Sequence, residues 1–114
     1  MNIKDIIKLL DAENLTPDLD CERELHSACG SDMMSDVLAY VKDQAVLLTG
    51  LVNAQVIRTA EMMDMVCIVF VRSKKPTPEM IELAKESGIV LMATGMRMYE
   101  ACGKLYSSGL TNGA

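Results

Sequence analysis

Aromatic residues are scarce in this chain, because its 114 residues include no Trp, one Phe and three Tyr. A core with so few rings must be filled by Ile, Leu, Val and the ten methionines, which pack adaptably. Half of the residues are apolar, which is enough for a modest core of about one domain. We therefore interpret residues 1–114 as a single domain.

The chain also lacks a long apolar run and a cluster of positive charge. No stretch approaches the roughly 20 apolar residues of a membrane span, and the first residues lack the layout of a signal peptide. The net charge is −5, and residues 1–45 hold four Lys and Arg against ten Asp and Glu. Because phosphate backbones are bound by clustered Lys and Arg, we expect no nucleic-acid partner. We also expect no membrane partner and a cytoplasmic location.

Close cysteine pairs are absent as well. Cys21, Cys29, Cys67 and Cys102 form no CxxC motif, so neither a zinc knuckle nor a thioredoxin-type pair is indicated. If residues 21–29 form one extended strand, Cys21 and Cys29 share a face but lie about 26 Å apart, at ~3.3 Å per residue. That separation is too long for a shared ion. We expect reduced thiols, no metal and no cofactor.

The spacing of apolar residues predicts a chain of short helices and strands. Helices are expected at residues 2–12, 31–43, 53–63, 76–88 and 95–109, and strands at 45–49, 66–72 and 89–94. Residues 13–20 look like a polar turn region, and alternation over residues 21–30 predicts an edge strand or an irregular arm. Ser31 is the expected cap of its helix with Asp32 in the first turn, and Thr77 and Gly88 should begin and end theirs. The sequence of residues 110–114 predicts no particular structure.

From residue 45 onward, strand and helix alternate. Repeated units of this kind build a parallel sheet with right-handed crossovers. The apolar run at residues 66–71 agrees, because six consecutive apolar residues indicate a strand covered on both faces. We expect an α/β domain whose mostly parallel sheet of four to five strands is flanked by helices. A flavodoxin-like arrangement of these elements is the alternative.

Several motifs occur in the order found in a known family. They are "SDVL" at residues 35–38, a strand that ends in Thr49-Gly50, "PEMIELAKESGI" at residues 78–89 and a closing helix after Thr94-Gly95. On this order, residues 22–110 resemble the DRTGG domain, a relative of the N-terminal domain of HPr kinase/phosphatase that is also inserted in some pyrophosphatases and phosphate acetyltransferases. The naming motif differs, since Gly-Leu-Val-Asn stands at residues 50–53. The resemblance implies a fold like that N-terminal domain and a regulatory, often dimeric, module without its own catalytic centre.

Polar corners follow the three predicted strands. Ligands of open parallel sheets bind outside the carboxyl ends of the strands, and helix starts there offer N–H groups to anions. The predicted ligand-binding residues are Thr49, Gly50, Asn53, Arg72, Lys74, Lys75, Thr94, Gly95 and Arg97. Neither glycine corner is a complete phosphate-binding motif, so each glycine can instead serve backbone geometry, and Asn53 can instead cap its helix.

No grouping of nucleophile, base and paired carboxylates is evident, so we predict no catalytic residue. The single histidine, His26, alternates on one face with Glu22 and Glu24, which is typical of a solvated surface. We predict a non-catalytic regulatory or scaffold module, a homodimer, that recognises a protein partner or a small anionic, nucleotide-like ligand. Two alternatives stay open: a redox-associated accessory protein whose cysteines hold a metal or iron–sulfur centre, and a small phosphoryl-transfer or hydrolytic enzyme.

Overall fold

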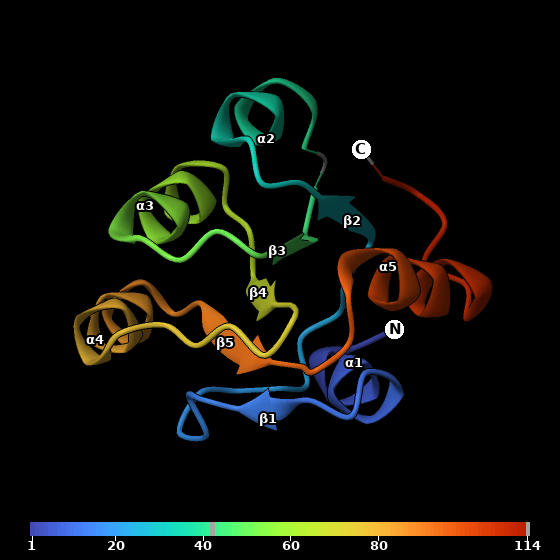
Figure 1. Ribbon diagram of the computed structural model, residues 1–114, viewed down its shortest axis with the longest axis horizontal. Helices are drawn as coiled ribbons and strands as arrows, with labels where there is room; N and C mark the ends of the chain where they lie inside the picture. Colours follow the sequence, from blue (N-terminus) through green and yellow to red (C-terminus); the bar gives the residue numbers. More distant parts are fainter. Residues whose placement is uncertain (42, 114) are drawn as a thin grey trace.

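The computed structural model describes residues 1–41 and 43–113 and has three layers, with helices on both faces of one sheet (Figure 1). The elements are α1 (Ile3–Leu9), β1 (Glu13–Asn14), β2 (Ser27–Gly30), α2 (Met34–Tyr40), β3 (Ala45–Thr49), α3 (Ala54–Met62), β4 (Cys67–Phe70), α4 (Pro78–Ser87), β5 (Val90–Ala93) and α5 (Met98–Ser107). The expected helix at residues 31–43 includes Lys42, which lies outside the described residues.

The sheet is mixed and has the strand order β1-β5-β4-β3-β2. The four strands from β2 to β5 are parallel, whereas β1 is antiparallel to β5. A mostly parallel sheet of four to five strands is thus confirmed. Strand β1 lies in residues 13–20, which the sequence predicts to be a polar turn. Its two residues pair with Ala93 and Met92, and a strand of two residues is too short to show an alternating sequence pattern.

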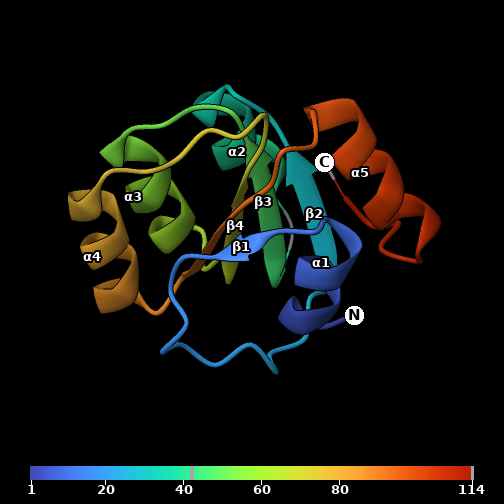
Figure 2. The same ribbon diagram turned by 60° about the horizontal axis from the view of Figure 1, so that its bottom comes forward.

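Helices α2, α3 and α4 cover one face of the sheet, and α1 and α5 cover the other (Figures 1 and 2). Strand β4 supplies both cores: Ile68 and Phe70 pack under α2 to α4, and Cys67 and Val69 pack under α1 and α5. All four side chains have no exposed surface. The prediction that this run is covered on both faces is therefore confirmed.

Two helices begin as the sequence predicts. Asn53 Oδ1 accepts a hydrogen bond from Val56 N at 3.2 Å, and Thr77 Oγ1 accepts one from Met80 N at 3.2 Å. Helix α4 ends at Gly88, whose φ of 73° is the left-handed conformation that glycine adopts without cost.

Helix α2 begins later than expected. Its first residue is Met34, and its cap residue Met33 makes no side-chain capping bond. Ser31 does not cap the helix, because its hydroxyl oxygen accepts a bond from Met33 N at 3.0 Å within the preceding turn. Asp32 therefore stays outside the first turn of α2, and its carboxylate is available for contacts elsewhere in the fold.

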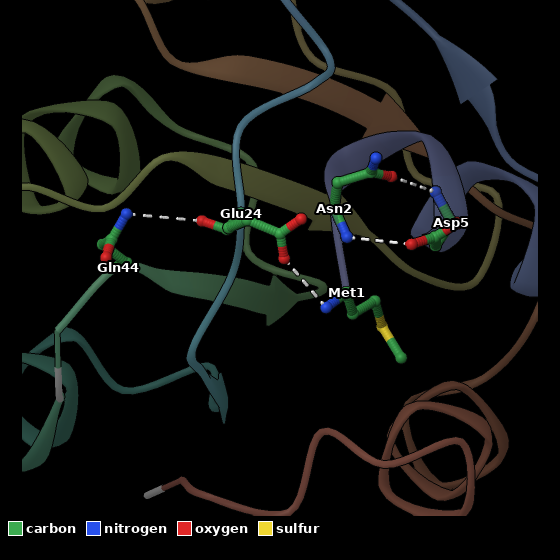
Figure 3. Close-up of polar contacts among 5 residues, drawn as sticks. All are labelled: Met1, Asn2, Asp5, Glu24 and Gln44. Carbon is green, nitrogen blue, oxygen red and sulfur yellow. Dashed lines mark hydrogen bonds and ion pairs between the residues drawn. The ribbon is translucent and has the colours of Figure 1, made fainter.

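The N-terminal segment is tied to the arm that precedes β2 (Figure 3). The Met1 amino group donates to Glu24 Oε2 at 3.0 Å, while Asn2 and Asp5 form a capping box at the start of α1. Gln44 Nε2 donates to the Glu24 carbonyl at 3.5 Å on the other side of the arm. The arm stays irregular until Ser27, so only Ser27–Gly30 forms the edge strand.

The C-terminal tail returns from α5 alongside β2 (Figure 1). Leu110 is 6% exposed, Ala28 N donates to the Asn112 carbonyl at 3.0 Å, and Gly113 forms a parallel bridge to Ala28. The tail thus covers part of the sheet edge, a role that its sequence does not predict. None of the helices in the described residues is both long and apolar enough to cross a membrane.

Candidate ligand-binding edge

The predicted site residues follow the carboxyl ends of β3, β4 and β5. The loop after β4 lies against the corner after β5, because Arg72 N donates to the Met96 carbonyl at 2.8 Å and Ser73 N donates to the Thr94 carbonyl at 2.9 Å. These two backbone bonds place Arg72 beside the Thr94-Gly95 corner. Lys74 directly follows Ser73 in the sequence, and Arg97 directly follows Met96.

Arg72 and Ser73 both adopt a left-handed backbone, with φ of 59° and 58°. Residues with side chains rarely adopt this region, so two in succession mark a constrained turn. The turn brings the Arg72 side chain over Gly50, where a Cβ would meet the guanidinium group. A side chain at residue 50 would therefore displace the end of Arg72, and the Gly50 corner and Arg72 lie in direct contact.

The residue that sequence reasoning missed is Asp32. Its Oδ1 accepts hydrogen bonds from Gly50 N at 2.7 Å and from Thr49 Oγ1 at 3.0 Å. Its Oδ2 lies 3.6 Å from Arg72 Nη2. The predicted anion-binding corner thus already holds a carboxylate of the chain itself. No local signal marks this role, because Asp32 also fits the first turn of a helix.

The two predicted threonines are buried and hydrogen-bond to the backbone of their own corners. Thr49 has no exposed surface and Thr94 is 2% exposed. Each hydroxyl oxygen accepts a bond from the N–H two residues on, Leu51 at 3.1 Å and Met96 at 3.2 Å. Thr94 Oγ1 also donates to the Leu10 carbonyl at 2.6 Å. Both hydroxyls are committed within the fold, and neither faces a ligand.

The four cations of the edge differ in their surroundings. Arg72 faces Asp32, and Lys75 Nζ lies 2.6 Å from Glu13 Oε1 on β1. Lys74 and Arg97 are exposed, and within residues 1–41 and 43–113 neither forms an ion pair. The positive charge that is open to a ligand is therefore concentrated at Lys74 and Arg97.

Asn53 belongs to a different hollow. A depression of about 710 Å³ lies between the starts of α3 and α4, and Asn53 lines it together with Arg58, Thr77 and Met80. Its rim carries three carboxylates, from Glu79, Glu82 and Glu86. Because three acids outnumber one arginine here, this hollow does not favour an anion.

All four cysteines have free thiols. Cys67 has no exposed surface, and burial raises the pKa of Cys29, Cys67 and Cys102, which disfavours their thiolates. Residues 21–29 do not form one extended strand, so the condition under which Cys21 and Cys29 would share a face is not met. Cys21 packs on the α1 and α5 side and Cys29 on the α2 to α4 side. Among the described residues, no three His, Cys, Asp or Glu side chains are grouped so as to hold a metal ion.

His26 lies just before β2, at the end of that strand opposite to Gly30 and the predicted ligand edge. Its ring is exposed and Nδ1 lies 3.7 Å from Asp43 Oδ2. The prediction of a solvated histidine is confirmed. The edge itself therefore has no imidazole to serve as a base.

The fold has a parallel among known structures. It is similar to the crystal structure of the CBS and DRTGG domains of the regulatory region of Clostridium perfringens pyrophosphatase, complexed with the activator diadenosine tetraphosphate. The TM-score is 0.77 at 18% identity, and the match covers 93% of this chain and 46% of that chain. No family model and no curated protein matches the sequence. The expectation of a DRTGG-like α/β fold is confirmed by this likeness.

Proposed function

We propose that this protein is a non-catalytic regulatory module that binds a small anionic, nucleotide-like ligand at the carboxyl edge of its parallel strands. The observation that carries the proposal is the pair of exposed cations, Lys74 and Arg97, that the bonded loops hold beside Arg72. A cationic edge in a chain of net charge −5 is a specific local feature. The similar regulatory region of the pyrophosphatase binds a nucleotide activator, which supports the same ligand class here.

The absence of catalysis is part of the proposal. The buried hydroxyls of Thr49 and Thr94 are already hydrogen-bonded, so neither is free to attack a ligand. His26 lies at the other end of the strands. The Asp32 carboxylate is bonded to Gly50 N and Thr49 Oγ1 and faces Arg72, which disfavours a role as a general base.

The ligand is expected to stabilise the folded protein, because anything that binds only the native state raises its stability. ATP and diadenosine tetraphosphate should raise the melting temperature in a dose-dependent manner, measured by differential scanning fluorimetry at low salt. Adenosine, which has no phosphate, is the matched control and should give no shift. Equal shifts with adenosine, or none with any nucleotide, would remove the anionic-ligand proposal and leave recognition of a protein partner.

We further propose that the module is a homodimer that pairs through the region around β2. This strand and the C-terminal tail that bonds to it form one edge of the sheet, and the helices that flank this edge expose large apolar side chains. These are Met33, Leu38 and Tyr40 at α2 and Tyr99 and Tyr106 on α5. All three tyrosines of the chain are among them, and tyrosine is enriched at the centres of interfaces.

Light scattering coupled to size-exclusion chromatography should give twice the chain mass of 12.5 kDa at micromolar concentration. Tyr106→Glu places a charge on the exposed surface of α5 and should shift the equilibrium toward the monomer without unfolding, because Tyr106 is 64% exposed. Met62→Glu on α3, where Met62 is 71% exposed, is the control and should stay dimeric. A monomeric wild-type protein would refute the dimer.

A further inference from the structure

Two corners of this fold are built alike but end differently. After β3 and after β5 the chain runs Thr-Gly, and in both corners the threonine hydroxyl accepts a bond from the N–H two residues on. The hydroxyl of Thr94 then donates to the Leu10 carbonyl, whereas that of Thr49 donates to the carboxylate of Asp32. Among residues 1–41 and 43–113, an acidic side chain is bonded to the glycine of the first corner only, since Gly50 N also donates to Asp32.

The position of this carboxylate is the one that a phosphate oxygen would take. Backbone N–H groups and an arginine guanidinium are the usual partners of phosphate in proteins. Asp32 Oδ1 accepts the Gly50 N–H at 2.7 Å, and Asp32 Oδ2 faces Arg72 Nη2 at 3.6 Å. The side chain therefore uses the N–H and partly neutralises the guanidinium that an incoming anion would need.

The carboxylate is held loosely enough to be displaced. Its side chain is 50% exposed, and its contact to Arg72 is longer than a hydrogen bond. Asp32 belongs to neither β2 nor α2, so a change of its rotamer breaks no secondary structure. Displacement then costs the bonds to Gly50 and Thr49, which a ligand oxygen can replace.

We infer that Asp32 is a specificity-determining residue of the proposed ligand site: it competes from within the chain for the Gly50–Arg72 corner, so that only ligands with several phosphates displace it. The inference rests on the proposed function. An intramolecular group has a high effective concentration, so one phosphate is a weak competitor. A polyphosphate can contact Lys74 and Arg97 at the same time, while one of its phosphates replaces the Asp32 carboxylate at Gly50.

The test compares the affinities of AMP and ATP for three proteins by isothermal titration calorimetry. Asp32→Asn keeps an oxygen acceptor for Gly50 N and Thr49 but removes the charge, and Asp36→Asn removes the same charge in the first turn of α2. Asp32→Asn should bind AMP about fivefold more tightly than Asp36→Asn does, because the single phosphate of AMP has only the Gly50–Arg72 corner to occupy. ATP also reaches Lys74 and Arg97 and should gain less, so the preference for ATP over AMP should fall. The wild type should bind ATP clearly more tightly than AMP.

A second variant, Asp32→Ser, removes the charge without placing an amide beside Arg72, so it shows whether that amide affects binding. Circular dichroism checks that each variant is folded. A smaller ratio of ATP affinity to AMP affinity in both Asp32 variants than in the wild type supports the inference. If the ratio is unchanged, or the variants bind AMP more weakly, the inference is overturned while the proposed function stands. If no protein binds either nucleotide, both are overturned.

Discussion

Replacing Phe70 with alanine is expected to lower the free energy of unfolding by about 3 to 5 kcal/mol, the usual cost of deleting a buried ring. Phe70 is the single phenylalanine, has no exposed surface and ends β4, the middle strand of the sheet. Its ring belongs to the core under α2, α3 and α4, where the other members are aliphatic, sulfur-containing or small side chains. Urea denaturation followed by circular dichroism measures the loss.

The loss is expected nearer the lower end of this range. Three methionines, Met34, Met65 and Met80, belong to the same core, and their flexible side chains can move into part of the vacated volume. Met62→Ala is the matched control, because Met62 on α3 is 71% exposed and its removal should change stability by no more than about 0.5 kcal/mol. Equal losses in the two variants would contradict the assignment of Phe70 to the core.

Removing Lys74 and Arg97 together should weaken nucleotide binding about a hundredfold or more. Each charge-assisted hydrogen bond to a phosphate contributes about 1.5 to 3 kcal/mol, and about 1.4 kcal/mol corresponds to a factor of ten. The double variant Lys74→Ala/Arg97→Ala should fold as the wild type does, because exposed charges without a partner contribute little to stability. Calorimetric titration with ATP measures the affinity.

The control removes the same charge elsewhere. Lys4 is near the arm before β2 and Lys104 is on the surface of α5, so Lys4→Ala/Lys104→Ala lowers the net charge equally and should leave affinity within about threefold, a long-range effect that salt screens. Lys75→Ala should also have a smaller effect than loss of Lys74, because Lys75 is already paired with Glu13. Equal weakening in the control would mean that net charge, not the edge, attracts the nucleotide.

Much of the fold can be predicted because its signals are local. The caps Asn53 and Thr77 act on N–H groups three residues away. The buried strand β4 is a continuous apolar run, and the alternation of strand and helix after residue 45 sets the parallel sheet. Topology alone therefore predicts a site at the carboxyl edge, since parallel strands end on the same side.

The wrong predictions concern residues whose structure depends on contacts that are distant in the sequence. Ser31 and Asp32 fit a helix start, yet the turn before α2 and the Gly50 corner hold them instead. The composition of residues 13–20 predicts a polar turn, yet strand β1 forms there. Pairing with β5, and not the local composition, makes these residues a strand. These are cases in which a tertiary contact overrides a local preference.

The sequence by itself determined the order of the elements, the buried central strands and the side of the sheet on which the polar corners lie, because each depends on spacing between near neighbours. Only the tertiary structure decided which charges of that side are open. Asp32 meets Thr49 across 17 residues and Lys75 meets Glu13 across 62, and such distant pairs leave no periodic trace in the chain. The physical reason is that a side-chain hydrogen bond or ion pair needs only that two side chains meet in space, whereas a helix or strand needs a repeating pattern along the chain.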